Sequence, residues 1–318
     1  MRFLHTSDWH LGQSFHQFER TYEHRQFLDW LVDTIEAEQP DALLISGDIF
    51  DNANPSAAAQ RQFYRFLSTA RARAPHLEVV LIGGNHDSPG RLEAPSPLFD
   101  AFDITAIGHV TRRSDGSIDL DRLLVPLHDR TGEVRAWCLA VPYLRPGDVP
   151  ASDGVHGYAD GVARLYRELL DRALSHREPG QALLAMGHCH MHGGAVSEDS
   201  ERRIVIGGAE ALPADIFDPR LAYVALGHLH RAQTVAAREG LRYCGSPLPM
   251  SFTEIDYPHQ ILRIDLDGEQ LGAVHTLRVP RAVDLLRVPP RPEGLDAALA
   301  ALAALQLPPR PPEAQPYV

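Results

Sequence analysis

The sequence of 318 residues contains no lysine, only three cysteines and no long hydrophobic run. A membrane-spanning helix needs about 18–20 apolar residues, so none is expected, and the N-terminal segment turns polar too early for a secretory signal. Cys138, Cys189 and Cys244 lie far apart and form no Cys-x-x-Cys pair, which favours reduced thiols over a disulfide framework. We therefore expect a cytoplasmic protein without membrane contact.

Because lysine is absent, arginine supplies all 30 basic residues against 42 acidic ones, and the formal net charge is −12. This acidic balance argues against a protein that coats nucleic acid through a basic surface. It leaves open an enzyme that meets phosphate through bound metal ions, because such ions dominate the local charge. The chain also contains 17 histidines, and several of them follow glycine, so histidine is the residue type most suggestive of a catalytic or metal-binding role.

The first third of the chain alternates apolar strand-like segments with amphipathic helix-like segments. Strands are expected at 2–6, 41–46 and 76–82, with helices at 20–38 and 56–73 between them. Apolar residues at helical spacing mark the first helix, and Asn54-Pro55-Ser56 is a typical start for the second. This order is the βαβ pattern of a parallel sheet, so the predicted fold class is α/β.

The rest of the chain predicts a second sheet with an antiparallel part. Strands are expected at 110–112, 123–127, 134–141, 182–186 and 221–226, and a helix at 158–175. Two hairpins are expected at 232–244 and 258–278, with turns at 238–240 and 267–268. Residues 279–318 differ in character, with a strand near 282–287, an alanine–leucine helix at 293–305 and a proline-rich tail. We therefore expect a main domain at 1–278 and a separate part at 279–318.

The most informative stretch is 81–87, where an apolar strand ends on two glycines and Asn85, His86 and Asp87 follow at once. Glycine lets the backbone bend sharply, and α/β proteins present functional side chains at the carboxyl ends of their strands. Four more expected strands end in similar residues, namely Asp8-x-His10, Gly47-Asp48, Gly187-His188 and Gly227-His228-x-His230. Together the five segments predict one shared site.

The residue types and their spacing indicate metal binding. In an extended segment, residues i and i+2 point to the same side, so both members of Asp8-x-His10 and of His228-x-His230 can face one cavity. Carboxylate, imidazole and amide donors suit ions such as Mn²⁺, Fe²⁺ or Zn²⁺. The candidate ligands are more than one ion needs, and they suit two ions about 3.5–4 Å apart that share a carboxylate. A lone Asp-x-His, by contrast, is common by chance.

The five motifs resemble those of the calcineurin-like binuclear metallophosphoesterases. Segments 1–13, 225–233 and 243–248 further resemble the bacterial SbcD-type nuclease subunits, and the resemblance extends to about residue 280. It implies a four-layer α/β/β/α sandwich at 1–278 and the start of a small α+β capping domain at 279–318. The chain stops where that domain should continue, so we expect a truncated capping domain.

The resemblance also implies ligands for two divalent metal ions, with Mn²⁺ as the expected metal. One ion would be held by Asp8, His10 and His230, the other by Asn85, His188 and His228, with Asp48 bridging both. His86 would contact the scissile phosphate and protonate the leaving oxygen. Asp87 would either orient His86 or cap a turn, and Asp51 is expected to be a loop cap.

The function that the resemblance implies is a metal-dependent DNA nuclease. It would act as a double-strand exonuclease and a single-strand or hairpin endonuclease in DNA repair and recombination. Expected partners are DNA and an SbcC-type ATPase, whose docking segment is expected to be missing here, and the chain is expected to form a homodimer. Leu98, Phe99 and Phe102 form an apolar helix face that suits either self-association or core packing.

Several alternatives remain open at this stage. The core motifs also fit a generic metallophosphoesterase acting on small phosphoesters, and a non-catalytic scaffold for DNA ends is a second alternative. Cys189, His190 and His192 could form a separate zinc cluster, although no second Cys/His pair lies at structural-zinc spacing. Arg91 and Arg231 could contact phosphate or simply face solvent.

Overall fold

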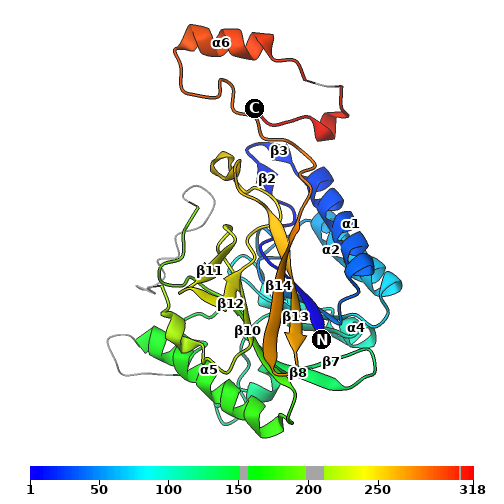
Figure 1. Ribbon diagram of the computed structural model, residues 1–318, viewed down its shortest axis with the longest axis vertical. Coiled ribbons are helices and arrows are strands. Elements are labelled where there is room, and N and C mark those ends of the chain that lie inside the picture. Colours follow the sequence, from blue (N-terminus) through cyan, green and yellow to red (C-terminus); the bar gives the residue numbers. More distant parts are fainter. Residues whose placement is uncertain (151–156, 198–210, 308) are drawn as a thin grey trace.

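The computed structural model describes residues 1–150, 157–197, 211–307 and 309–318 and contains two six-stranded sheets (Figure 1). The first sheet has the order β14-β13-β1-β4-β5-β6. Its strands are β1 (Arg2–Thr6), β4 (Ala42–Ser46), β5 (Glu78–Ile82), β6 (Ile104–Ile107), β13 (Gln260–Asp267) and β14 (Gln270–Arg278). β1, β4, β5 and β6 are parallel, and the β13–β14 hairpin adds the antiparallel edge.

The second sheet has the order β11-β12-β10-β9-β8-β7. Its strands are β7 (Leu124–His128), β8 (Val134–Ala140), β9 (Ala182–His188), β10 (Tyr223–Gly227), β11 (Gln233–Val235) and β12 (Arg238–Tyr243). The four central strands are parallel, and β7 and β11 pair antiparallel at the two edges. The antiparallel part predicted for the second sheet is thus confirmed.

Helices cover the outer faces of the two sheets. α1 (Thr21–Glu38) and α2 (Ala57–Arg73) lie beside the first sheet, and α5 (Gly157–His176) lies beside the second (Figure 1). The smaller elements are the β2 (Ser14–Phe15)–β3 (Phe18–Glu19) hairpin, α3 (Pro89–Glu93), α4 (Ser96–Phe99) and α6 (Leu295–Ala304). The predicted α/β/β/α sandwich is confirmed. No helix in the described ranges is both long and apolar enough to span a bilayer.

Side chains alternate between the two faces of each strand, and this alternation explains why a hydrophobic core lies on either side of the first sheet. In β4, Leu44 joins the core between the sheets, whereas Leu43 and Ile45 join the core under α1 and α2. Successive strand residues point to opposite faces, so an unbroken apolar strand supplies two cores at once. The α2 helix begins where Ser56 Oγ accepts a hydrogen bond from the amide of Ala59 (3.2 Å), which satisfies one donor of the first turn.

Three expected elements differ from the structure. The strand expected at 110–112 in the second sheet is only an isolated bridge between Arg112 and Ile118, and the strand just before it, β6 at 104–107, belongs to the first sheet. The strand expected near 282–287 is likewise a single bridge, between Leu285 and Tyr317. The first hairpin turns at Ala236 and Ala237, whose φ values are +49° and +55°, and residues 238–240 belong to β12. A register shift after Thr234 moves this turn.

The C-terminal segment 279–318 lies beyond the β2–β3 hairpin, and its α6 helix stands away from both sheets (Figure 1). None of the α6 residues is buried. The segment contacts the sandwich through Tyr317, whose ring centre is 4.8 Å from that of Phe15. The Tyr317 hydroxyl donates to Glu23 Oε1 (3.0 Å) on α1. The chain end is therefore anchored beside the hairpin although α6 is not packed.

Candidate metal centre

Five strand ends meet at one edge of the sandwich, three from the first sheet and two from the second. β1, β4 and β5 lead into the loops of Asp8, Asp48 and Asn85, and β9 and β10 lead to His188 and His228. The donor atoms of the predicted residues fall into overlapping groups within 4.8 Å of one another. The structure thus brings together residues that are separated by up to about two thirds of the chain.

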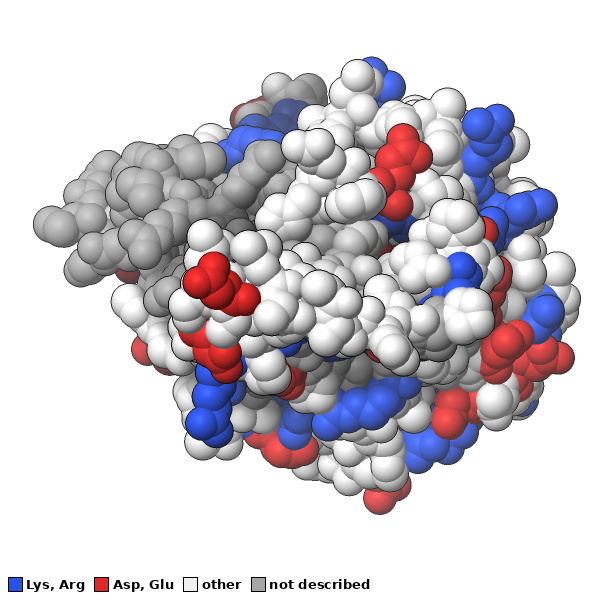
Figure 2. All heavy atoms as spheres, turned by 90° about the horizontal axis from the view of Figure 1, so that it is seen from above, with Lys and Arg blue, Asp and Glu red and all other residues white. Residues whose placement is uncertain are grey.

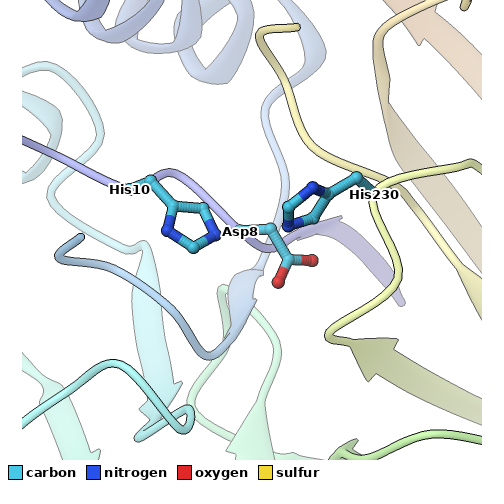
Figure 3. Close-up of side chains that lie close together, drawn as sticks. All are labelled: Asp8, His10 and His230. Carbon is cyan, nitrogen blue, oxygen red and sulfur yellow. The ribbon is translucent and has the colours of Figure 1, made fainter. Parts of the chain in front are cut away.

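The first group consists of Asp8, His10 and His230 (Figure 3). All three are buried, and the two imidazole rings lie 5.2 Å apart between centres with the Asp8 carboxylate beside them. Neither ring nitrogen of His10 has a hydrogen-bond partner among the described residues, although both atoms are buried. Buried nitrogens without partners are costly in a folded protein, and a cation bound to one of these nitrogens would satisfy it.

The second group consists of Asp48, His188 and His228, joined by Asn85. The Asn85 Oδ1 atom lies 3.0 Å from His188 Nε2 and 3.1 Å from His228 Nδ1. Two imidazole nitrogens, an amide oxygen and a carboxylate therefore converge on one point. This mixed oxygen and nitrogen donor set fits a borderline divalent ion.

Asp48 lies between the two groups. Its Oδ2 atom is 3.3 Å from His188 Nε2 in the second group and 3.7 Å from His10 Nε2 in the first. Its Oδ1 atom accepts the backbone N–H of His86 at 2.9 Å. One carboxylate thus contacts both groups and positions the loop that carries His86.

The backbone of the site is strained. Asp8, His10, Asp48 and His228 have φ values of +56°, +46°, +48° and +104°, in a region that L-residues with a Cβ rarely adopt. Each such residue costs on the order of 1–3 kcal/mol, and this kind of strain concentrates at functional sites. Close approach of the loops adds a second constraint, because a Cβ on Gly84 would collide with the Asp48 side chain.

Two contacts orient histidines of the site. His188 Nδ1 donates to the Ser46 carbonyl (2.8 Å), which directs Nε2 toward Asn85 and Asp48. A similar arrangement holds His230, whose Nδ1 lies 3.5 Å from Oε1 of the fully buried Glu254. Metal-binding histidines commonly use the second ring nitrogen in this way. Glu254 lies outside the five motifs, so no spacing in the sequence marks it as part of the site.

The charges of Asp48 and His188 depend on each other. Burial raises the pKa of Asp48, but the charge and hydrogen bond of His188 outweigh this and hold it well below its usual range. Burial lowers the pKa of His188, but Asp48 raises it to about 9. Burial and the charge of His188 together hold the pKa of His228 well below its usual range. A divalent ion would take the place of the His188 proton beside the ionised Asp48.

His86 belongs to a third close group, in which donor atoms of His10, Asp48 and His86 lie within 4.8 Å of one another. Its ring centre is 4.8 Å from that of His10, and its Nδ1 donates to the Asp51 carbonyl at 2.6 Å. The Asp51 side chain also approaches the site, because its Oδ1 lies 3.5 Å from His10 Nδ1. Asp51 therefore supports two histidines at once, which the expectation of a loop cap did not include.

Asp87 is buried and joins two of the strand-end loops. Its carboxylate accepts backbone N–H groups from Gly84 (2.9 Å), Ile49 (3.2 Å) and Phe50 (2.9 Å). Burial and the neighbouring charge of Asp48 raise the pKa of Asp87 to about 6. These contacts fit the turn-capping alternative that the sequence left open beside an orienting role.

The residues considered for a separate zinc cluster do not form one in the described part of the chain. None of the groups of close donor atoms contains Cys189, His190 or His192. The Cys189 thiol instead lies 3.7 Å from Met191 Sδ, and burial raises its pKa to about 12. A protonated thiol is a poor metal ligand.

Comparisons with known proteins agree with this geometry. A calcineurin-like phosphoesterase family model matches residues 1–232. The SbcD subunit of nuclease SbcCD from Rhodobacter capsulatus is 43% identical over 325 residues, which cover 100% of this chain and 79% of the relative. The Escherichia coli K12 protein of that name is 34% identical over 291 residues, covering 88% and 68%. The Bacillus subtilis one is 36% identical over 274 residues, covering 83% and 66%.

A solved structure is similar in fold alone. It is a Staphylococcus aureus protein with a proposed 5′-nucleotidase function, 12% identical, with a TM-score of 0.50. The similarity covers 95% of this chain and 58% of the other. It supports the sandwich architecture and carries no statement about substrate.

Proposed function

The chain belongs to the calcineurin-like phosphoesterases and, within them, to the SbcD family of nuclease subunits, and from this premise we propose that it hydrolyses phosphodiester bonds of DNA. The observation that carries the proposal is the pair of donor groups joined by Asp48. A shared carboxylate between two imidazole-rich groups is the arrangement that two-metal hydrolysis of phosphate esters requires.

We propose that the residues bind metal as the family resemblance implies. Asp8, His10 and His230 would hold one ion, Asn85, His188 and His228 the other, and Asp48 both. Two divalent ions, which we propose to be Mn²⁺, would supply a nucleophilic hydroxide near neutral pH and neutralise the charge of the phosphate. Ser46 and Glu254 keep two of the imidazoles in orientation.

His86 is the proposed catalytic residue. The Asp51 carbonyl accepts the proton on Nδ1, which leaves Nε2 as the ring atom that would give a proton to the leaving sugar oxygen. The hydrogen bond from the His86 amide to Asp48 ties this ring to the carboxylate between the two metal groups. His86 would therefore stay aligned with the phosphate whenever Asp48 is correctly placed.

The proposed partners follow from the family and from one surface. As the relatives are subunits of a two-component nuclease, we propose an SbcC-type ATPase as partner, a cytoplasmic location and roles in DNA repair and recombination. Residues 279–318 would be the start of a capping domain.

We also propose a homodimer, because an apolar groove of about 430 Å³ lies between α2 and α4. Leu98 (68% exposed) and Phe102 (47% exposed) line it without covering it.

A Leu98→Glu variant tests the homodimer. A carboxylate in the groove should prevent burial of that face, so sedimentation velocity should show a dimer for the unmodified chain and a monomer for the variant. Leu295→Glu, on the equally exposed α6, is the matched control and should leave the dimer intact. A monomer without any substitution would contradict the homodimer.

Cleavage of a labelled hairpin DNA with Mn²⁺, Mg²⁺ or EDTA tests the proposed function. We expect cutting with Mn²⁺ and complete loss with EDTA that added Mn²⁺ restores, because the donor set is built to act through bound ions. Bis-p-nitrophenyl phosphate, a small diester, serves as a second substrate. Turnover of that ester with intact DNA would favour a generic phosphoesterase, and turnover of neither with two bound metals would favour a scaffold.

A further inference from the structure

We propose that Arg145 and Arg231 bind two backbone phosphates of the cleaved strand, one on each side of the scissile phosphate. This inference rests on the proposed nuclease function and goes beyond it, because it assigns the path of the strand across the metal centre. Each guanidinium lies over a tyrosine ring, and each of these two pairs lies beside a different donor group. We call Tyr143 with Arg145, and Tyr257 with Arg231, the two arginine–tyrosine pairs.

The first pair lies beside the second donor group. The Tyr143 ring is edge-on to His188, with 6.3 Å between ring centres. The Tyr143 amide donates to the Gly83 carbonyl (2.8 Å), which joins the loop after β8 to the turn that carries Asn85. The Arg145 guanidinium carbon lies 5.6 Å from the centre of the Tyr143 ring. The Tyr143 ring therefore connects the Arg145 cation to His188.

The second pair lies beside the first donor group. Arg231 follows His230 directly, and its guanidinium carbon lies 5.6 Å from the centre of the Tyr257 ring. His230, Arg231, Tyr257 and the buried His259 line one small pocket of about 160 Å³. The second cation is therefore held next to the ligand of the other proposed ion.

Both cations are available to bind an anionic ligand. Among the residues that the structure describes, neither guanidinium forms an ion pair or hydrogen bond, and both residues are exposed. Arg113, which is also exposed, is by contrast paired with Asp119 (2.9 Å) and Asp121 (2.8 Å). A guanidinium held over an aromatic ring keeps its N–H donors available and loses little freedom when it binds an anion.

The rest of the surface makes such single cations important. In Figure 2, basic and acidic side chains are interspersed on the face shown, and no continuous basic surface covers it. With a net charge of −12, the chain as a whole repels DNA, so attraction has to be local. A strand whose scissile phosphate lies at Asp48 between the donor groups would extend toward one arginine–tyrosine pair on either side.

Kinetics of Arg145→Ala and Arg231→Ala test the inference, with Arg167→Ala on the outer face of α5 as a control of equal charge change. On an oligonucleotide with a mapped cleavage site, each of the first two variants should raise KM about tenfold, as expected for one lost phosphate contact. Turnover of bis-p-nitrophenyl phosphate should change far less than DNA cleavage, since that ester has no flanking phosphates. Arg145→Lys and Arg231→Lys should retain most of the binding, because the charge is kept.

Oligonucleotides with one neutral methylphosphonate, placed 5′ or 3′ of the cleaved linkage, assign the two sides. The unmodified chain should lose binding with either substitution. Each alanine variant should be insensitive to the methylphosphonate on its own side and sensitive to the one on the other side, because a contact cannot be lost twice.

The outcomes separate the two levels of the proposal. If the unmodified chain cuts DNA but both alanine variants behave like Arg167→Ala, the inference is overturned and the nuclease function stands. If the unmodified chain turns over the small diester and leaves every DNA substrate intact, the proposed function fails and the inference fails with it. Sensitivity of both alanine variants to the same methylphosphonate would contradict the two-sided path.

Discussion

An Asp48→Asn variant is expected to lose both proposed metal ions at concentrations that saturate the unmodified chain, and with them about 100-fold or more in nuclease rate. The Asp48 Oδ2 atom contacts His188 at 3.3 Å and His10 at 3.7 Å, so removal of its charge weakens both donor groups. Asparagine tolerates the left-handed backbone that residue 48 adopts, so the variant removes the charge and leaves the fold. Metal content after dialysis and DNA cleavage measure the two effects.

Asp29→Asn on the exposed side of α1 is the matched control and should keep both ions and full activity. Circular dichroism should show the same fold for both variants. If Asp48→Asn retained two ions with unchanged affinity, Asp48 would not be the shared ligand. Loss of a single ion would assign Asp48 to one donor group only.

A His86→Ala variant is expected to keep both ions and lose about 10²–10⁴-fold in the rate of DNA cleavage, the range for a general acid. The hydrogen bond that reaches Asp48 comes from the backbone N–H of His86 and survives the substitution, so the shared carboxylate should keep its place. Single-turnover cleavage and metal analysis of the same sample separate the two properties.

An ester with a better leaving group sharpens this test. Bis-p-nitrophenyl phosphate releases nitrophenolate, which needs no proton, so His86→Ala should lose far less activity on that ester than on DNA. His275→Ala on the exposed strand β14 is the control and should not change either rate. Equal losses on both substrates would assign His86 to phosphate binding rather than to proton transfer.

Much of the fold was predictable because strand apolarity and helix spacing are local properties. β1, β4, β5 and the helices α1 and α2 were expected within a few residues of their observed bounds. The first hairpin turn was not, because alanine has no preference for the left-handed backbone that Ala236 and Ala237 adopt. Pairing between β11 and β12, with its register shift, decides that turn, and such pairing is a tertiary property.

The site shows the same division. Its candidate ligands follow strands and glycines, so they carry a local signal, and the structure brings them within reach of one another. The contacts that support these ligands carry no such local signal in the sequence. Glu254 approaches His230 from a short 3₁₀ turn, and the backbone carbonyls of Ser46 and Asp51 accept the histidine N–H groups. A carbonyl oxygen is present at every residue, so no pattern of side chains can reveal its use.

The distribution of the donor residues over the two sheets has a mechanical consequence. Asp8, His10, Asp48 and Asn85 come from the first sheet, and His188, His228 and His230 from the second. All three cysteines are unpaired thiols, so the sandwich has no covalent cross-link between its halves. Ions bound at this edge would connect segments more than 200 residues apart, as a disulfide does in a secreted protein. A chelator would then act on the chain as a reducing agent acts on such a protein, opening the sandwich at one edge.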